Sequence, residues 1–305
     1  MGVETAMNFR DKHRMKAILR VAGLPVAPQA LIRAPDDARA FADRVGWPLI
    51  LKPLDGVGSQ GTWRVGSHDQ LSHALRALQP SPERAIQAEA FIRGDERTFE
   101  SVLVGGEAAW MSQTLYLNRP LEILETPWMQ WTVLFPREEL DAAAQAFAPL
   151  HVAAVRALGQ TSGMAHMEWF IQADGTPIIS EVGARPPGAR FLRMLGQAHD
   201  ADLWARWAEL EVLGTWRPLP PRRYAVGCAF FRAQGQGRRI TAVHGLDRAQ
   251  QLVGEHVIDR DLPRIGAAPR ASYEGDGWAV VRHPDTAVVR DALRTLISTV
   301  RVELG

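Results

Sequence analysis

The chain has 305 residues, of which 46% are hydrophobic and 23% charged, as is typical of a soluble globular protein with two or three lobes. A formal net charge of +1 provides no strong field for nucleic acid or an anionic membrane, so neither partner is expected. The single cysteine, Cys228, excludes an internal disulfide framework and a multi-cysteine metal site, and we expect it to be a packing residue. No stretch has the length or apolar core of a membrane span or signal peptide, which predicts a cytoplasmic protein.

The first amphipathic pattern is helical, ends at Gly23 and carries Lys12 and Lys16 four residues apart on one face. Only three of the 35 basic residues are lysines. A lysine in such a chain indicates a position where a compact ammonium on a flexible stem is needed. For both residues a phosphate contact is a candidate role, and for Lys16 a solvated helix face is an equal alternative.

The third lysine, Lys52, ends an apolar run and precedes a glycine-rich loop in the segment 47–65, WPLILKPLDGVGSQGTWRV. The spacing of Gly56, Gly58 and Gly61 matches a dinucleotide fingerprint, but that motif opens a helix, whereas this loop leads into a β-type segment. The segment therefore predicts a strand, a flexible loop and a second strand. We expect the backbone at Gly58, Ser59 and Gly61 to close over phosphates; a plain glycine hairpin with a surface lysine is the alternative.

Helices are predicted at 35–46 and 69–78, and with the hairpin they complete a small lobe that ends near Pro80. Residues 85–104 then predict two strands with a break at Gly94, as expected of a hinge between lobes. Such a hinge can present backbone groups and Glu89 to an adenine edge, and Glu96 to ribose hydroxyls. A solvent-facing strand position is the alternative for both glutamates.

Residues 112–135 contain several aromatic residues without a clean period, which favours a lid or a binding surface, with packing between lobes as the alternative. Residues 136–158 predict a long amphipathic helix that is bent near Pro149.

A predicted hairpin turn at 173–176 makes the flanking strands antiparallel neighbours, so that Glu168 and Glu181 can face each other. Two opposed carboxylates repel unless a cation lies between them, and carboxylates plus phosphate oxygens are the usual ligands of Mg²⁺. His166 shares a face with Glu168 and has either a substrate-facing or a structural role. Arg185 and Arg190 follow, and a guanidinium fits a carboxylate or phosphate.

These linked motifs resemble the ATP-grasp superfamily of carboxylate–amine ligases over roughly residues 8–195, and the C-terminal stretch looks like that of the amino-acid ligase branch. The resemblance implies an α+β fold in which two α+β lobes clamp ATP, followed by a C-terminal lobe. It implies boundaries of 1–86 for the small lobe, 87–210 for the large lobe and 211–305 for the C-terminal lobe.

The resemblance also implies ATP and Mg²⁺ as the cofactors and assigns roles to individual residues. The implied roles are Lys12 and Lys52 on the ATP phosphates, Glu89 and the backbone of Phe91 and Ile92 on adenine, Glu96 on ribose, Glu168 and Glu181 on Mg²⁺, and Arg185 on the transferring phosphoryl group or acyl phosphate. Arg185, Arg190 and His166 are the candidate substrate contacts.

Two features depart from the family pattern. Gly183 stands where most members have a metal-binding asparagine, which predicts weaker or water-completed coordination. Only eleven residues precede Lys12, where the family has an α/β domain, so a second copy of the chain or a partner subunit is expected to supply the missing wall.

The predicted function is an ATP-dependent ligase of the carbon–nitrogen class that joins small-molecule acid and amine substrates through an acyl phosphate. The alternatives are a bicarbonate-activating ATP-grasp carboxylase and a non-catalytic ATP-binding or regulatory module.

Overall fold

The computed structural model describes residues 1–305 apart from 55–60 and 127, and it divides into two compact units. Unit 1 combines Met1–Ala109 with Ala142–Arg185, and unit 2 combines Trp110–Asp141 with Pro186–Gly305. The boundaries predicted from the family resemblance stay a prediction.

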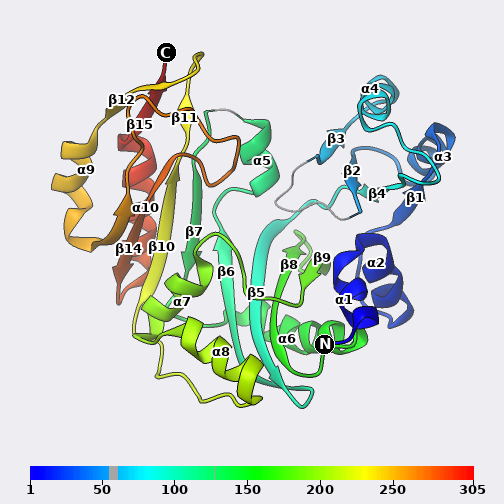
Figure 1. Ribbon diagram of the computed structural model, residues 1–305, viewed down its shortest axis with the longest axis horizontal. Coiled ribbons are helices and arrows are strands. Elements are labelled where there is room, and N and C mark those ends of the chain that lie inside the picture. The colour runs from blue at the N-terminus through cyan, green and yellow to red at the C-terminus, as the bar shows by residue number, and fades with distance from the viewer. Residues whose placement is uncertain (55–60, 127) are drawn as a thin grey trace. The chain divides into compact units, whose positions relative to one another are not determined.

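A four-stranded antiparallel sheet with strand order β1-β4-β2-β3 lies within unit 1 (Figure 1). Alternate residues of its strands, such as Leu49 and Leu51, are buried against Phe41 and Leu71 of the two helices that follow β1 and β3. The other face of the sheet carries the side chains between them, including Lys52. The two predicted strands are confirmed, whereas residues 55–60 between them, including Gly58 and Ser59, lie outside the described residues. The elements are β1 (Gln29–Ile32), α3 (Pro35–Val45), β2 (Leu49–Pro53), β3 (Trp63–Val65), α4 (His68–Leu78) and β4 (Ile86–Ala90).

The rest of unit 1 holds three strands in the order β5-β8-β9 together with three helices. Phe147 of helix α6 stacks on Trp169 with ring centroids 4.2 Å apart and lies 5.7 Å from Phe99, which anchors the helix on the sheet. The two strands predicted at 85–104 and the hairpin beyond 163 are confirmed. The elements are α1 (Val3–Arg10), α2 (Lys12–Val21), β5 (Asp95–Val104), α6 (Ala142–Ala157), β8 (Gly163–Ile171) and β9 (Pro177–Gly183).

The helix predicted to begin at residue 136 begins instead at Ala142. The carbonyl of Glu139 accepts a hydrogen bond from the N–H of Gln113, 3.1 Å away, so this part of the backbone is paired with a strand residue before the helix begins. The prediction failed at this end because a distant backbone donor competed with local helix formation.

The prediction of an irregular lid at 112–135 is wrong, because most of this segment is regular and buried. It contains the end of β6 (Glu107–Tyr116), helix α5 (Pro120–Glu125) and β7 (Trp131–Phe135). All residues of β7 are buried, and Trp131 stacks on Phe230 with centroids 4.7 Å apart. A strand buried on both faces has no alternating pattern, which is why the sequence showed no period.

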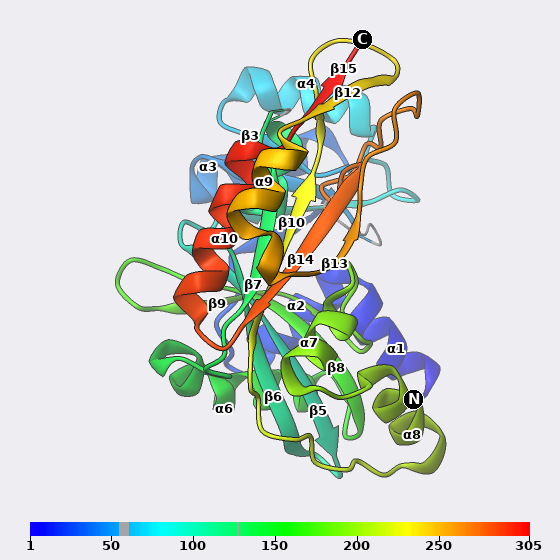
Figure 2. The same ribbon diagram turned by 90° about the vertical axis from the view of Figure 1, so that its left-hand side faces the viewer.

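Unit 2 contains the strands in the order β13-β14-β10-β7-β6 and a small sheet in the order β11-β15-β12. Helix α10 lies over one face of β10 and β14, and α9 packs against α10 (Figure 2). Cys228 in β10 is buried, as predicted for a packing residue, and burial raises the pKa of its thiol. The remaining elements are α7 (Phe191–His199), α8 (Leu203–Leu213), β10 (Ala225–Phe231), β11 (Ala233–Gln234), β12 (Ile240–His244), α9 (Leu246–Val253), a 3₁₀ turn (Gly254–His256), β13 (Val257–Asp261), β14 (Gly277–His283), α10 (Thr286–Thr299) and β15 (Arg301–Leu304).

Within the described part of the chain, no helix has both the length and the apolar character that crossing a membrane requires.

Candidate functional site

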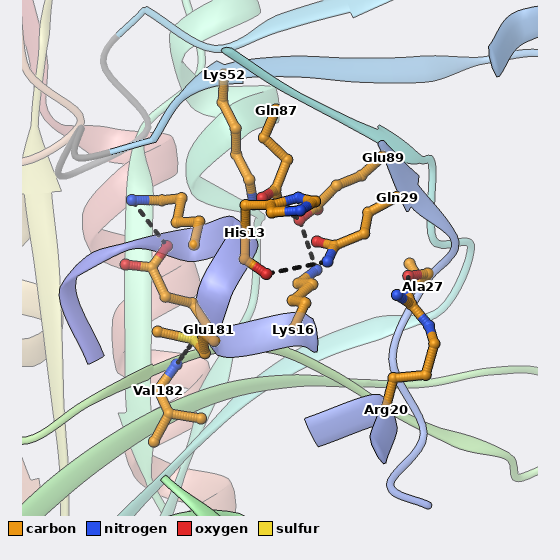
Figure 3. Close-up of polar contacts among 12 residues, drawn as sticks. His13, Lys16, Arg20, Ala27, Gln29, Lys52, Gln87, Glu89, Glu181 and Val182 are labelled. Atoms are coloured by element: carbon orange, nitrogen blue, oxygen red, sulfur yellow. Dashed lines mark hydrogen bonds and ion pairs between the residues drawn. The ribbon is translucent and has the colours of Figure 1, made fainter. Parts of the chain in front are cut away.

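All three lysines of the chain meet in unit 1. Lys12 and Lys16 belong to helix α2, and Lys52 belongs to strand β2. Figure 3 shows Lys16 and Lys52. Their exposed fractions are only 7%, 1% and 9%, respectively. The alternative that Lys16 lies on a solvated helix face is therefore wrong. A buried cluster of ammonium groups requires carboxylates close by or an anionic ligand, because desolvation opposes every buried charge.

Glu89 of strand β4 lies between two of these lysines. The Nζ of Lys16 is 2.7 Å from Oε1 of Glu89, and the Nζ of Lys52 is 3.0 Å from Oε2. Gln87, two residues earlier on the same strand face, donates its Nε2 hydrogen to Oε1. The register explains the arrangement, since Lys52 lies opposite Gln87 and hence diagonal to Glu89. Glu89 is thus a buried ion-pair residue, and the solvent-facing alternative is wrong.

The two ion pairs determine the protonation of the cluster. Burial alone would raise the pKa of Glu89, but the charges of Lys16 and Lys52 outweigh it and lower this pKa to about 2. Burial lowers the pKa of Lys16 to about 8, against the opposing attraction of Glu89. Burial acts on Lys52 in the same direction, yet the attraction of Glu89 and Glu181 outweighs it, so the pKa of Lys52 is raised.

Selective ¹³Cε labelling of lysine tests this electrostatic pattern, because three lysines give three assignable signals. We expect the Lys16 signal to titrate near pH 8 and the Lys52 signal above the ordinary lysine value of 10.5. The spectrum of Lys16→Met lacks the Lys16 signal and that of Lys52→Met lacks the Lys52 signal, which assigns both. Lys16 and Lys52 signals that titrate together near the ordinary value would contradict the buried cluster.

The predicted carboxylate pair is formed by neighbouring strands. Glu168 of β8 lies directly opposite Glu181 of β9 in the strand register. Burial and the charge of Glu181 raise the pKa of Glu168, as expected of two carboxylates held close together. The Nζ of Lys12 is 3.6 Å from Oε2 of Glu181, which connects the carboxylate pair to the lysine cluster.

The donor set fits Mg²⁺ bound jointly with a nucleotide. Among the described residues no group of three or more histidine, cysteine, aspartate or glutamate side chains is arranged to hold a metal. Mg²⁺ bound to nucleotides needs only one or two protein carboxylates, because phosphates and water supply the remaining oxygens. Gly183 adds no oxygen, and a Cβ built there would lie 3.5 Å from Cγ of Arg185. The Arg185 side chain therefore lies beside the strand position where asparagine was expected.

His166 has a buried carboxylate partner that the sequence analysis did not select. Its Nδ1 is 3.0 Å from Oε1 of Glu100, the residue opposite it in strand β5. Thr98 donates to the same oxygen at 2.6 Å. The alternation of β5 places Thr98 and Glu100 on one strand face, and the register with β8 brings that face beside Glu168. The hydrogen-bonded histidine is observed, and the substrate contact of His166 stays a prediction.

The adenine contacts of Glu89 and of the Phe91 backbone stay predictions. The N–H of Phe91 donates to the carbonyl of Pro48 at 3.1 Å, so this N–H is used within unit 1 and the Phe91 carbonyl is the remaining backbone candidate. The Ile92 backbone contact and the Glu96 ribose contact stay predictions. Glu96 lies in β5 opposite Phe170.

Arg190 belongs to unit 2, not to the unit that holds the lysines. Its guanidinium lies 3.7 Å from the ring centroid of Trp278 and 3.5 Å from a carboxylate oxygen of Asp259. Gly61 does lie in unit 1, at the end of the undescribed loop, with a positive φ of 69° that favours glycine.

A family model described as carbamoyl-phosphate synthase L chain, ATP binding domain, matches residues 11–95. This range contains all three lysines and Glu89.

Individual relatives extend the similarity beyond that range. A D-alanine–D-alanine ligase of Frankia casuarinae is 32% identical over 219 residues, which are 63% of this chain and 53% of the relative. An L-arginine-specific L-amino acid ligase of Bacillus subtilis is 26% identical over 209 residues, 67% of this chain and 49% of the relative. The chain spans about half the length of these curated relatives.

The solved structure of an L-amino acid ligase from Bacillus licheniformis matches with a TM-score of 0.78 and 22% identity. The match covers all of this chain and 74% of that one, so it extends the shared fold across both units.

Proposed function

We propose that this chain, which belongs to the ATP-grasp superfamily, uses ATP to join the carboxyl group of one small molecule to the amine of another. The products are an amide, ADP and phosphate. The observation that carries the proposal is the convergence of the three lysines on Glu89 and Glu181, beside the opposed pair Glu168 and Glu181. A cationic cluster beside paired carboxylates is suited to a polyphosphate with a bound divalent cation.

The first step is an attack of a substrate carboxylate oxygen on the γ-phosphorus of ATP. A bond forms between the carboxylate oxygen and the γ-phosphorus. At the same time the bond between the γ-phosphorus and the β,γ-bridging oxygen breaks, and ADP leaves with that electron pair. Negative charge is redistributed over the transferring group, and cations placed there in advance lower the barrier. Lys12 and Lys52 fit contacts to the phosphates, and Arg185 fits the transferring group or the acyl phosphate.

The second step is an attack of the amine nitrogen on the acyl carbon. A C–N bond forms, phosphate leaves with the C–O bonding electrons, and the nitrogen gives its proton to the leaving phosphate or to water. His166 is the candidate substrate contact on the strand face of Glu168, and Glu100 orients its ring. Positioning and the exclusion of water contribute most, because water competes with the amine for the acyl phosphate.

Glu168 and Glu181 would hold Mg²⁺, which when bound offsets phosphate charge and orients the polyphosphate. The protein contributes a buried, cross-strand carboxylate pair next to Lys12, and these residues keep the phosphate-binding lysines close to the metal ligands.

Amino acids or short peptides are the proposed substrates. The matched relatives named for D-alanine and for L-amino acids support this class. The guanidinium of Arg185 is suited to an α-carboxylate or to the acyl phosphate. It therefore does not indicate whether it contacts the acid substrate or the intermediate.

Phosphate release from Mg·ATP across single amino acids and amino-acid pairs tests the proposed activity. We expect release that requires a pair and that yields a product of the condensed mass by mass spectrometry, because the acyl phosphate needs an amine acceptor. The matched control omits one member of each productive pair.

Two other outcomes would contradict the proposal. Release that requires bicarbonate and no organic acid would indicate the carboxylase alternative. Tight Mg·ATP binding without release under any condition of the panel would indicate a non-catalytic ATP-binding module.

A further inference from the structure

Lys16 is buried more completely than either of the other lysines, yet the proposed chemistry gives it no role. It lies one helical turn after Lys12 on α2, with an exposed fraction of 1%, and its ammonium contacts Oε1 of Glu89. Burying an ammonium is costly. A methionine would fill a similar volume without that cost, so packing alone does not explain a lysine at this position.

The surrounding contacts hold Lys16 in a fixed place (Figure 3). The helix that carries it begins at Lys12 and is capped by Asp11, whose side chain accepts from the N–H groups of His13 and Arg14. Gln29 of β1 donates to the His13 carbonyl at 3.1 Å, and the sulfur of Met15 lies 3.3 Å from the N–H of Val182. These contacts connect helix α2 to β1 and β9 and fix its position. The Lys16 ammonium is therefore held close to Glu89.

The balance of charges in this cluster indicates an electrostatic role for Lys16. Lys16, Lys52 and Glu89 together carry two positive charges and one negative charge, so one positive charge remains for an anion. Without Lys16, Glu89 would neutralise Lys52 and could bind it with both oxygens. The Lys52 ammonium would then be drawn toward β4, and the site would lose its excess charge.

We propose that Lys16 is a positioning residue: it occupies one oxygen of Glu89, which holds Lys52 on the other oxygen and leaves the Lys52 charge available to the phosphates of ATP. Lys16 itself need not touch the nucleotide. The inference rests on the proposed function, since it takes Lys52 as a phosphate-binding group.

A charge-counting set of variants tests the inference by the dissociation constant for Mg·ATP and by KM and kcat. Lys16→Met removes the excess charge and is expected to weaken Mg·ATP binding about tenfold or more, with a smaller change in kcat. The double variant Lys16→Met/Glu89→Gln restores one uncompensated ammonium, Lys52. Its Mg·ATP affinity is therefore expected to exceed that of Lys16→Met by about threefold or more.

Arg14→Met is the matched control on the same helix. Arg14 is paired with Glu4, away from Glu89, so its loss removes a cation without changing the cluster. We expect its Mg·ATP affinity to equal that of the parent. If Lys16 served only as packing, the double variant would bind no better than Lys16→Met, and this result would overturn the inference.

If the single variant Lys16→Met fails to fold, the pH dependence of Mg·ATP affinity in the parent and in the double variant tests the same inference. The charged groups that face Lys16 are Glu89 of β4, Lys52 of β2 and Glu181 of β9. Raising the pH above about 8 deprotonates Lys16 in the parent while Lys52 stays charged, so Mg·ATP affinity should fall. The double variant should not show this fall. Equal pH dependence in both proteins would also overturn the inference.

The outcomes separate the two proposals. A parent protein that binds no Mg·ATP would contradict the proposed function. A parent that binds Mg·ATP, together with a folded Lys16→Met variant of unchanged affinity, would contradict the role of Lys16 alone.

Discussion

Replacing Lys52 by methionine is expected to lower kcat/KM for Mg·ATP by about a hundredfold to a thousandfold, as for the loss of one donor to a developing anion. The Lys52 ammonium is held at 3.0 Å from Glu89, and in the proposed function it supplies the positive charge that contacts the phosphates. The fold should survive, because Glu89 keeps its 2.7 Å partner Lys16. Steady-state kinetics, with circular dichroism as the folding check, measure both effects.

Arg39→Met provides the matched control for this variant. Arg39 is a cation of helix α3 in the same unit, and it pairs with Asp36 at the surface. Its replacement should leave kcat/KM unchanged. A folded Lys52→Met protein with the parent's kcat/KM would show that Lys52 does not serve the phosphates.

Glu89→Gln is expected to lower the free energy of unfolding by about 3–5 kcal/mol, as for other buried ion pairs that lose one partner. The change leaves the ammonium groups of Lys16 and Lys52 close together without their shared counter-charge. Urea denaturation at neutral pH measures the loss. Glu83→Gln, which changes an exposed glutamate just before β4, is the control and should cost little.

The dependence of the free energy of unfolding on pH in the acid range is a second test of the Glu89 ion pairs. The pKa of Glu89 in the folded protein is about 2, below its ordinary value of 4.5, so its stabilising contribution is present above the ordinary value. That contribution is lost as the pH falls toward 2. The parent should therefore lose more stability than Glu89→Gln between pH 4.5 and 2. Parallel losses in the two proteins would show that Glu89 is not held by the lysines.

The predicted α+β ATP-grasp fold is confirmed, and local signals account for much of that success. The turn at 173–176 was enough to make the two strands antiparallel neighbours, but its register alone would place Glu168 opposite Ser180. An irregularity between Glu168 and Trp169 shifts the register by one residue and brings Glu168 opposite Glu181. The scarcity of lysine selected Lys12 and Lys52 without any structural information.

The role of Glu89 could not be predicted in the same way. Its partner Lys16 lies on a helix 73 residues earlier, and no local period links an α2 position to a β4 position. The same limit applies to Glu100, whose pairing with His166 depends on the register between β5 and β8. Both carboxylates occur in strands, where an isolated glutamate is usually solvent-facing.

Buried strands caused the main errors in the fold. In β7 both faces are covered, so Trp131 and Phe135 gave no alternation, and their aromatic character suggested a lid. At the start of α6 the helical pattern extended too far, because the sequence does not reveal that the Glu139 carbonyl accepts from Gln113.

In the proposed reaction a substrate carboxylate takes the γ-phosphoryl group before the amine attacks. An amino-acid mixture with ¹⁸O in its carboxyl groups tests this order of events by the mass of the phosphate released from Mg·ATP. We expect phosphate that carries one ¹⁸O atom, because the oxygen that attacks phosphorus leaves with it when the amide forms. Phosphate release that is dependent on the mixture but free of ¹⁸O would contradict the acyl-phosphate ligase.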